Sequence, residues 1–118
     1  MCEVNVDTIR RAHKICPVTA IQSEYHLMHR MVETNGVLEL CEDLGIGFVP
    51  YSPLNRGFLG GMINEYTKFD VTNDNRQTLP RFQPEAIRAN YRIVEVLNAF
   101  GRTRGITPAQ IALAWLMN

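Results

Sequence analysis

Two short apolar runs, each preceded by an amphipathic helical pattern, constrain the fold of this chain most strongly. The run at residues 46–51 is apolar on both of its faces, and the run at residues 18–22 is equally short and apolar. A strand that is apolar on both faces is typical of a parallel sheet, which is covered by helices on one side and by a core on the other. The alternation therefore predicts an α/β fold with two parallel strands.

The predicted helices have recognisable ends. Residues 6–14 follow Asn5, a good N-cap, and the helix is expected to end before Pro17. Residues 35–44 are expected to begin with Asn35 as N-cap and to end at Gly45. The side chains expected to face inward from this second helix are Val37, Leu38, Leu40, Cys41 and Leu44.

The second half of the chain is predicted to be a loop followed by two helices. Residues 52–83 are rich in Gly, Asn and Pro and are read as one long loop, a kind of segment that often carries function. Pro84 opens a long helix, and residues 107–110 (TPAQ) form a capping box for a last one. The inward stripe of the long helix is expected to be Ile87, Tyr91, Val94, Leu97 and Phe100.

Two parallel strands leave their edges unpaired, whereas an α/β barrel needs eight strands to close. We therefore expect residues 1–118 to form a single incomplete domain, part of a larger barrel, and to self-associate through exposed edges.

Charge and composition limit the class of partner. Twelve basic residues balance twelve acidic ones, which gives no field to attract nucleic acid or anionic lipid. No apolar run approaches the ~20 residues that span a bilayer, and the first residues lack signal-peptide features. We expect a cytoplasmic protein with reduced cysteines and a small-molecule partner, without nucleic acid or membrane.

The segment at residues 51–57 (YSPLNRG) follows a predicted strand directly, which is where ligands bind in α/β folds. Tyr51 offers an aromatic ring for stacking, and Ser52 a hydroxyl group. Arg56 offers a positively charged guanidinium, and Gly57 a backbone that no side chain shields from a ligand. These groups suit a ligand with a flat ring and phosphates. A plain turn set by Pro and Gly explains the same residues equally well.

No metal site is predicted. His26 and His29 lack a third ligand and are read as surface or lining residues. Asp70, Thr72 and Asp74 imitate the start of a calcium loop, but the later Gly and Glu positions do not match.

Four stretches resemble the aldo-keto reductase family, close to its pyridoxal-reductase-like or auxin-induced-like branch. They are residues 22–30 (QSEYHLMHR), 45–61 (GIGFVPYSPLNRGFLGG), 79–82 (LPRF) and 107–116 (TPAQIALAWL), in the family's order. The resemblance implies a (β/α)8 TIM barrel that reduces aldehydes and ketones with NADPH. This chain would supply about the sixth and seventh strands with their surrounding helices.

The resemblance also implies roles for individual residues. Gln22 would hydrogen-bond the carboxamide of the nicotinamide, and Tyr51 would stack on its ring. The positions implied to follow the ribose and pyrophosphate are Ser52, Leu54, Asn55, Arg56 and Gly57.

No catalytic residue is expected in this chain. The family's Asp, Tyr, Lys and His tetrad lies on earlier strands, and neither Tyr25 nor Tyr51 matches its proton donor. The isolated chain is therefore expected to be inactive. The basic segment that recognises the 2′-phosphate of NADPH likewise has no match here.

Two alternatives stay open. Residues 94–117, with a helix, a turn at Gly105 and a capped helix, also fit a helix-turn-helix DNA-binding module. A cofactor-binding subunit that serves mainly in protein interactions is compatible with the same family.

Overall fold

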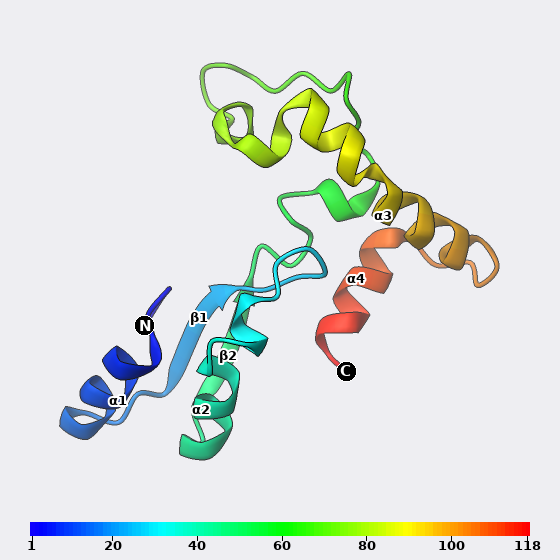
Figure 1. Cartoon of the computed structure of the whole chain (residues 1–118). Helices are drawn as coiled ribbons and strands as arrows, with labels where there is room; N and C mark the ends of the chain where they lie inside the picture. Colours follow the sequence, from blue (N-terminus) through cyan, green and yellow to red (C-terminus); the bar gives the residue numbers. More distant parts are fainter. The chain divides into compact units, whose positions relative to one another are not determined.

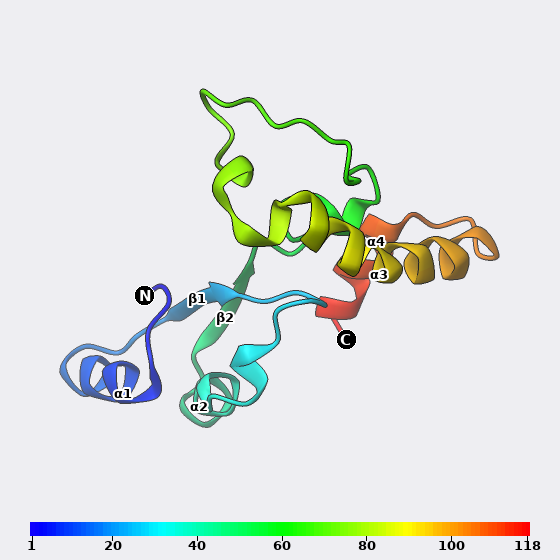
Figure 2. The same cartoon turned by 45° about the horizontal axis from the view of Figure 1, so that its top comes forward.

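The computed structural model describes all residues, 1–118, as two compact units, Met1–Pro53 and Leu54–Asn118. Figures 1 and 2 show the order of the elements from the blue N-terminus to the red C-terminus. Each unit is best understood by itself.

The first unit repeats a helix followed by a strand. Its main elements are α1 (Val6–Ile15), β1 (Ala20–Glu24), the 3-10 turn η1 (Met31–Glu33), α2 (Val37–Leu44) and β2 (Gly47–Tyr51). The strands are parallel, in a register that pairs Ala20 with Gly47 and Glu24 with Tyr51. The predicted α/β order is confirmed, and β1 begins and ends two residues later than expected.

The core of the first unit lies between the helices and one face of the sheet. Ile9 of α1, Ile21 of β1 and Leu40 of α2 are almost completely buried. Side chains alternate across a strand, so Ile21 and its partner Phe48 share this helix-facing side. The opposite face carries Gln22 and Val49, and Val49 is 44% exposed. The expectation of β2 buried on both faces is therefore wrong for Val49, because α1 and α2 both pack on the Ile21 side.

The helix caps follow the sequence with one correction. The Asn5 side chain accepts a hydrogen bond from the Thr8 amide at 2.9 Å, as a cap should. Gly36, not Asn35, is the N-cap of α2, with φ of +81°. A Cβ at Gly36 would lie 3.3 Å from the Val6 side chain, so glycine suits the position for both reasons. Asn35 supports the turn from one residue earlier by accepting from the Val37 amide at 3.1 Å.

The second unit begins at Leu54, within the segment predicted to be a long loop. Residues 52–83 contain three 3-10 turns: η2 (Phe58–Gly60), η3 (Asn75–Thr78) and η4 (Pro80–Phe82). Phe82 contacts both Phe58 and Phe69 edge-on, with ring centroids 6.4 and 5.6 Å apart. The prediction of a long loop was right in position but missed these turns, because Phe58 of η2 and Phe82 of η4 make aromatic contacts between residues distant in sequence.

Two helices complete the second unit. α3 (Pro84–Arg102) buries Ile87, Val94 and Leu97, while Tyr91 is half-buried. Phe100 is 46% exposed, because its ring lies under the Arg104 guanidinium at 3.7 Å rather than in the core. α4 (Pro108–Leu116) has the predicted capping box between Thr107 and Gln110. None of the helices is long and apolar enough to cross a membrane.

The close approach of α3 to the following turn gives a stability prediction. A Cβ at Gly101 would lie 2.2 Å from the Ile106 carbonyl oxygen, which is backbone and cannot rotate away. We expect Gly101→Ala to lower the free energy of unfolding by roughly 1–3 kcal/mol, even after the helix-propensity gain of about 1 kcal/mol. Urea denaturation measures this. At Gly60 an added Cβ meets nothing within 4 Å, so Gly60→Ala is the control, and equal midpoints for both variants would contradict the prediction.

Candidate functional site

The candidate site in the first unit lies at the carboxyl ends of β1 and β2. Gln22 and Tyr51 lie on the same face of the sheet, because Gln22 pairs with Val49 and Tyr51 is two residues further along. Gln22 is exposed, and its Oε1 accepts from Cys2 Sγ at 3.6 Å. Cys2, Ala20, Gln22 and Val49 line a groove on this face. This face is free of the unit's own helices and therefore accessible to a ligand.

Tyr51 is held in a carboxylate-rich setting. Burial raises the pKa of its hydroxyl above the usual 10.0, and the charges of Glu3 and Glu24 add to this effect. The Glu3 carboxylate also accepts from the Glu24 amide at 2.6 Å. Tyr51 therefore keeps its proton at neutral pH and presents a neutral ring.

The sequence did not lead us to predict that Cys2, Glu3 and Glu24 lie around Gln22 and Tyr51. The signal was available for the first two: in an α/β chain, residues just before a helix occupy the carboxyl end of a strand. Cys2 forms a parallel bridge with Gln22, which places residues 1–3 alongside β1 in this manner. Glu24 had a weaker signal, since only the strand register brings it opposite Tyr51.

Ser52 is the last residue of the candidate site in the first unit. Its φ is +51°, in the left-handed region that residues with side chains adopt rarely. The chain therefore turns sharply out of β2 directly after Tyr51.

A separate candidate site, within the second unit, is the turn at residues 54–57. Asn55, Arg56 and Gly57 all have positive φ, at +47°, +52° and +95°. The Leu54 carbonyl closes the turn by accepting from the Gly57 amide at 3.1 Å and the Leu59 amide at 3.0 Å. Asn55 is 3% exposed, so its side chain belongs to the interior of the turn. Arg56 is exposed and extends into a pocket.

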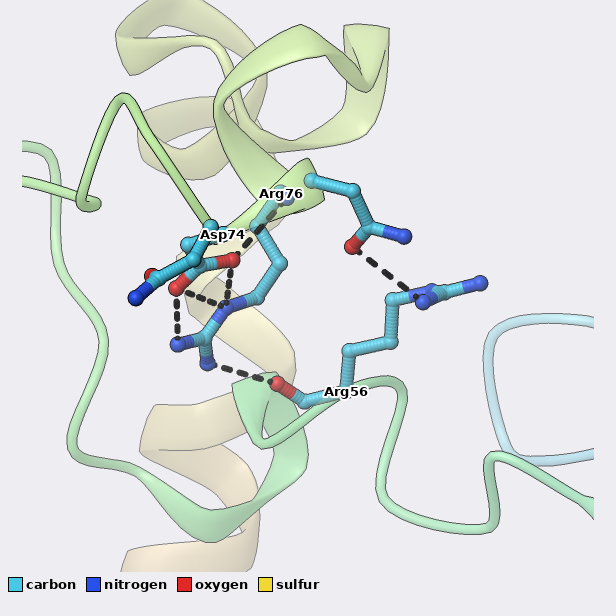
Figure 3. A pocket seen from close by; sticks show the side chains of 5 residues that line it. Arg56, Asp74 and Arg76 are labelled. Carbon is cyan, nitrogen blue, oxygen red and sulfur yellow. Dashed lines mark hydrogen bonds and ion pairs between the residues drawn. The ribbon is translucent and has the colours of Figure 1, made fainter.

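Arg76 joins this turn to the loop at residues 73–76. Its guanidinium forms an ion pair with Asp74, through Nε at 2.9 Å and Nη2 at 2.5 Å, and lies 4.7 Å from the centre of the Phe69 ring. Its Nη1 donates to the Arg56 carbonyl at 3.0 Å (Figure 3). The hydrogen bonds from Arg76 hold the pKa of the Asp74 carboxyl below its usual value. Arg76 thus fixes the backbone from which Arg56 projects.

The resulting pocket is lined by Arg56, Asn73, Asp74, Asn75 and Arg76 (Figure 3). Arg56 donates to the Asn75 side chain at 3.4 Å, a long hydrogen bond, and it forms no ion pair. Arg76, by contrast, is paired with Asp74. The Arg56 guanidinium is therefore the group in this pocket with capacity left for an anion. Asn73, Asp74 and Arg76 were not predicted as site residues, because their place depends on the folding of the loop.

His26 differs from expectation, whereas His29 is half-buried. His26 is 1% exposed, its Nε2 lies 3.1 Å from Glu24 Oε1, and its Nδ1 accepts from the Met28 amide at 3.2 Å. Reading it as a surface or lining residue was wrong, because these bonds satisfy both ring nitrogens in the interior. No group of three His, Cys, Asp or Glu side chains is placed to hold a metal ion. Asp70 instead caps a local turn by accepting from the Thr72 amide at 2.8 Å.

The parallel strands and flanking helices match part of a known barrel. The chain superposes with a TM-score of 0.87 on the structure of a glycerol dehydrogenase from Gluconobacter oxydans, at 23% identity, covering 98% of this chain and 35% of that one. This match confirms the predicted fold class, a part of an α/β barrel.

The sequence comparisons identify the family. The sequence model of the Aldo/keto reductase family matches residues 1–118. A protein of Glycine max described as probable aldo-keto reductase 1 is 44% identical over 117 residues, which are 99% of this chain and 33% of that protein. The chain belongs to the aldo/keto reductase family, and it spans about a third of the length of these relatives.

The raised pKa of Tyr51 leads to a prediction at alkaline pH. In the folded state the hydroxyl keeps its proton above pH 10.0, whereas in the unfolded state it is lost near that value. This contribution to stability is therefore fully present below pH 10 and is lost as the pH rises through the folded pKa. We expect Tyr51→Phe, which cannot ionise, to lose less stability than the wild type between pH 9 and pH 11 in urea denaturation. Equal losses in the two proteins would show that Tyr51 is not responsible.

Proposed function

We propose that this chain supplies part of the cofactor site of an NADP(H)-dependent reductase that converts aldehydes and ketones to alcohols. The observation that carries the proposal is the placement of Gln22 and Tyr51 on one accessible face, at the adjacent carboxyl ends of β1 and β2. An amide and an aromatic ring in this arrangement suit a nicotinamide, whose carboxamide hydrogen-bonds and whose ring stacks. Family membership supports the same ligand.

The Arg56 pocket supports a role in holding the phosphates. A guanidinium without a carboxylate partner, on a backbone held by Arg76, is pre-arranged for an oxyanion. We assign Ser52, Leu54, Asn55 and Gly57 to the stretch of chain that follows the ribose and pyrophosphate of the cofactor near Arg56. Asn55 would contribute through its backbone, since its side chain is buried.

The bound cofactor would supply hydride, and the residues of this chain would bind and orient it. No residue here matches the proton donor of the family, so we assign none of them to catalysis. The rest of the barrel would supply that chemistry, and residues 1–118 would form one incomplete domain within it. A cytoplasmic location and a small carbonyl substrate complete the proposal.

The helix-turn-helix alternative has no supporting observation. α4 carries neither Lys nor Arg, and a DNA-reading helix needs groups that reach bases and phosphates. A role as a cofactor-binding subunit for other proteins uses the same site, so aldehyde turnover by the full-length protein is the measurement that separates the two.

Removal of the Arg56 charge tests the phosphate contact. In the full-length protein we expect Arg56→Gln to weaken NADPH binding about 10- to 100-fold, the range for one charge-assisted hydrogen bond. Isothermal titration calorimetry measures the affinity. Arg92→Gln, on an exposed position of α3, is the charge-matched control and is expected to bind as the wild type does. Equal affinities for all three proteins would refute the assignment of Arg56.

The isolated chain is expected to show no NADPH oxidation with small aldehydes, because it lacks a proton donor for the developing alkoxide. It is also expected to self-associate, since its sheet has two strands with open edges. Absorbance at 340 nm and sedimentation velocity test the two expectations separately. Turnover by purified 118-residue material, or a stable monomer in dilute solution, would each contradict one of them.

A further inference from the structure

The segment before α1 brings a carboxylate to the candidate nicotinamide site. The Gln22 amide donates to the Met1 carbonyl at 2.8 Å, and the Glu3 amide donates to the Gln22 carbonyl at 3.0 Å. These bonds continue the parallel bridge between Cys2 and Gln22. Glu3 therefore lies at the carboxyl end of β1, beside the two residues proposed to contact the nicotinamide.

The Glu3 carboxylate is held beside Tyr51. Its Oε1 accepts from the Glu24 amide at 2.6 Å, and Glu24 pairs with Tyr51 across the sheet, so the negative charge of Glu3 lies close enough to raise the pKa of the Tyr51 hydroxyl. The backbone of Glu3 has φ of +49°, a left-handed conformation that disfavours residues with side chains. Such a conformation persists only where the surroundings hold it, and here the Glu24 amide holds the carboxylate at the end of the sheet where Tyr51 lies.

A fixed carboxylate distinguishes the two redox states of a nicotinamide. The oxidised ring carries a positive charge that the reduced ring lacks, so a nearby negative charge stabilises the oxidised form more. We propose that Glu3 is a specificity-determining residue, whose carboxylate beside Tyr51 favours binding of the oxidised cofactor, NADP+, over NADPH. This inference rests on the proposed function, because it requires that the nicotinamide stack on Tyr51.

The test compares dissociation constants for NADP+ and NADPH in the full-length protein by calorimetry. We expect Glu3→Gln to weaken NADP+ binding about three- to tenfold and to leave NADPH binding within about twofold. Glu39→Gln, on the exposed face of α2, removes the same charge away from the site and serves as the matched control. Its ratio of the two constants is expected to equal that of the wild type.

A second variant keeps the test decisive if Glu3→Gln does not fold. Glu3→Asp retains the charge but draws it back from Tyr51 by one methylene, so a shift of about twofold in the same direction is expected. A ratio unchanged in the variants, or equal weakening of both cofactors, overturns the inference and leaves Glu3 with a structural role. Failure of the wild type to bind either cofactor instead refutes the proposed function on which the inference rests.

Discussion

The parallel register of β1 with β2 is the constraint on which the candidate site in the first unit depends. Parallel strands require a crossover, which α2 supplies, and they bring both carboxyl ends to the same edge of the sheet. Side chains alternate between faces, so a shift of one residue would move Gln22 or Tyr51 to the side packed against the helices. The buried pair of Ile21 with Phe48 opposes such a shift, because it would bring polar Gln22 into the core.

Much of this arrangement was predictable, because its causes are local. Apolar periodicity indicated the helices and strands, and the caps at Asn5 and Thr107 were predicted from residue type alone. The choice of Gly36 over Asn35 as N-cap was missed because residue type favours Asn at this position, whereas Gly36 adopts a left-handed backbone and makes no side-chain cap bond. Identifying Gln22 and residues 51–57 as site residues required the family resemblance as well as the chemistry, because the chemistry alone fitted an ordinary turn.

The parts of the candidate site that escaped prediction are those that rely on tertiary contacts. Arg76 appears in the sequence as one of several loop arginines. Its place is set by Phe69, which packs on Phe82, and by Asp74, which neutralises its charge. This pairing has a consequence for Arg56. Arg76 forms an ion pair with Asp74 and donates a hydrogen bond to the Arg56 carbonyl, so its role is structural. Arg56 is the arginine whose guanidinium can still bind an anion.

Backbone strain gives an independent argument for where the site lies. The residues other than glycine with positive φ are Glu3, Ser52, Asn55 and Arg56. Each such residue costs of order 1–3 kcal/mol, and such residues concentrate where function over-determines the backbone. All four lie at a strand's carboxyl end or in the turn that follows it. The family resemblance implied a role for Ser52, Asn55 and Arg56 but not for Glu3. The backbone angles are independent of the family resemblance that selected Ser52, Asn55 and Arg56. Their positive φ values therefore support the proposed role of these three residues, and the same feature supports including Glu3.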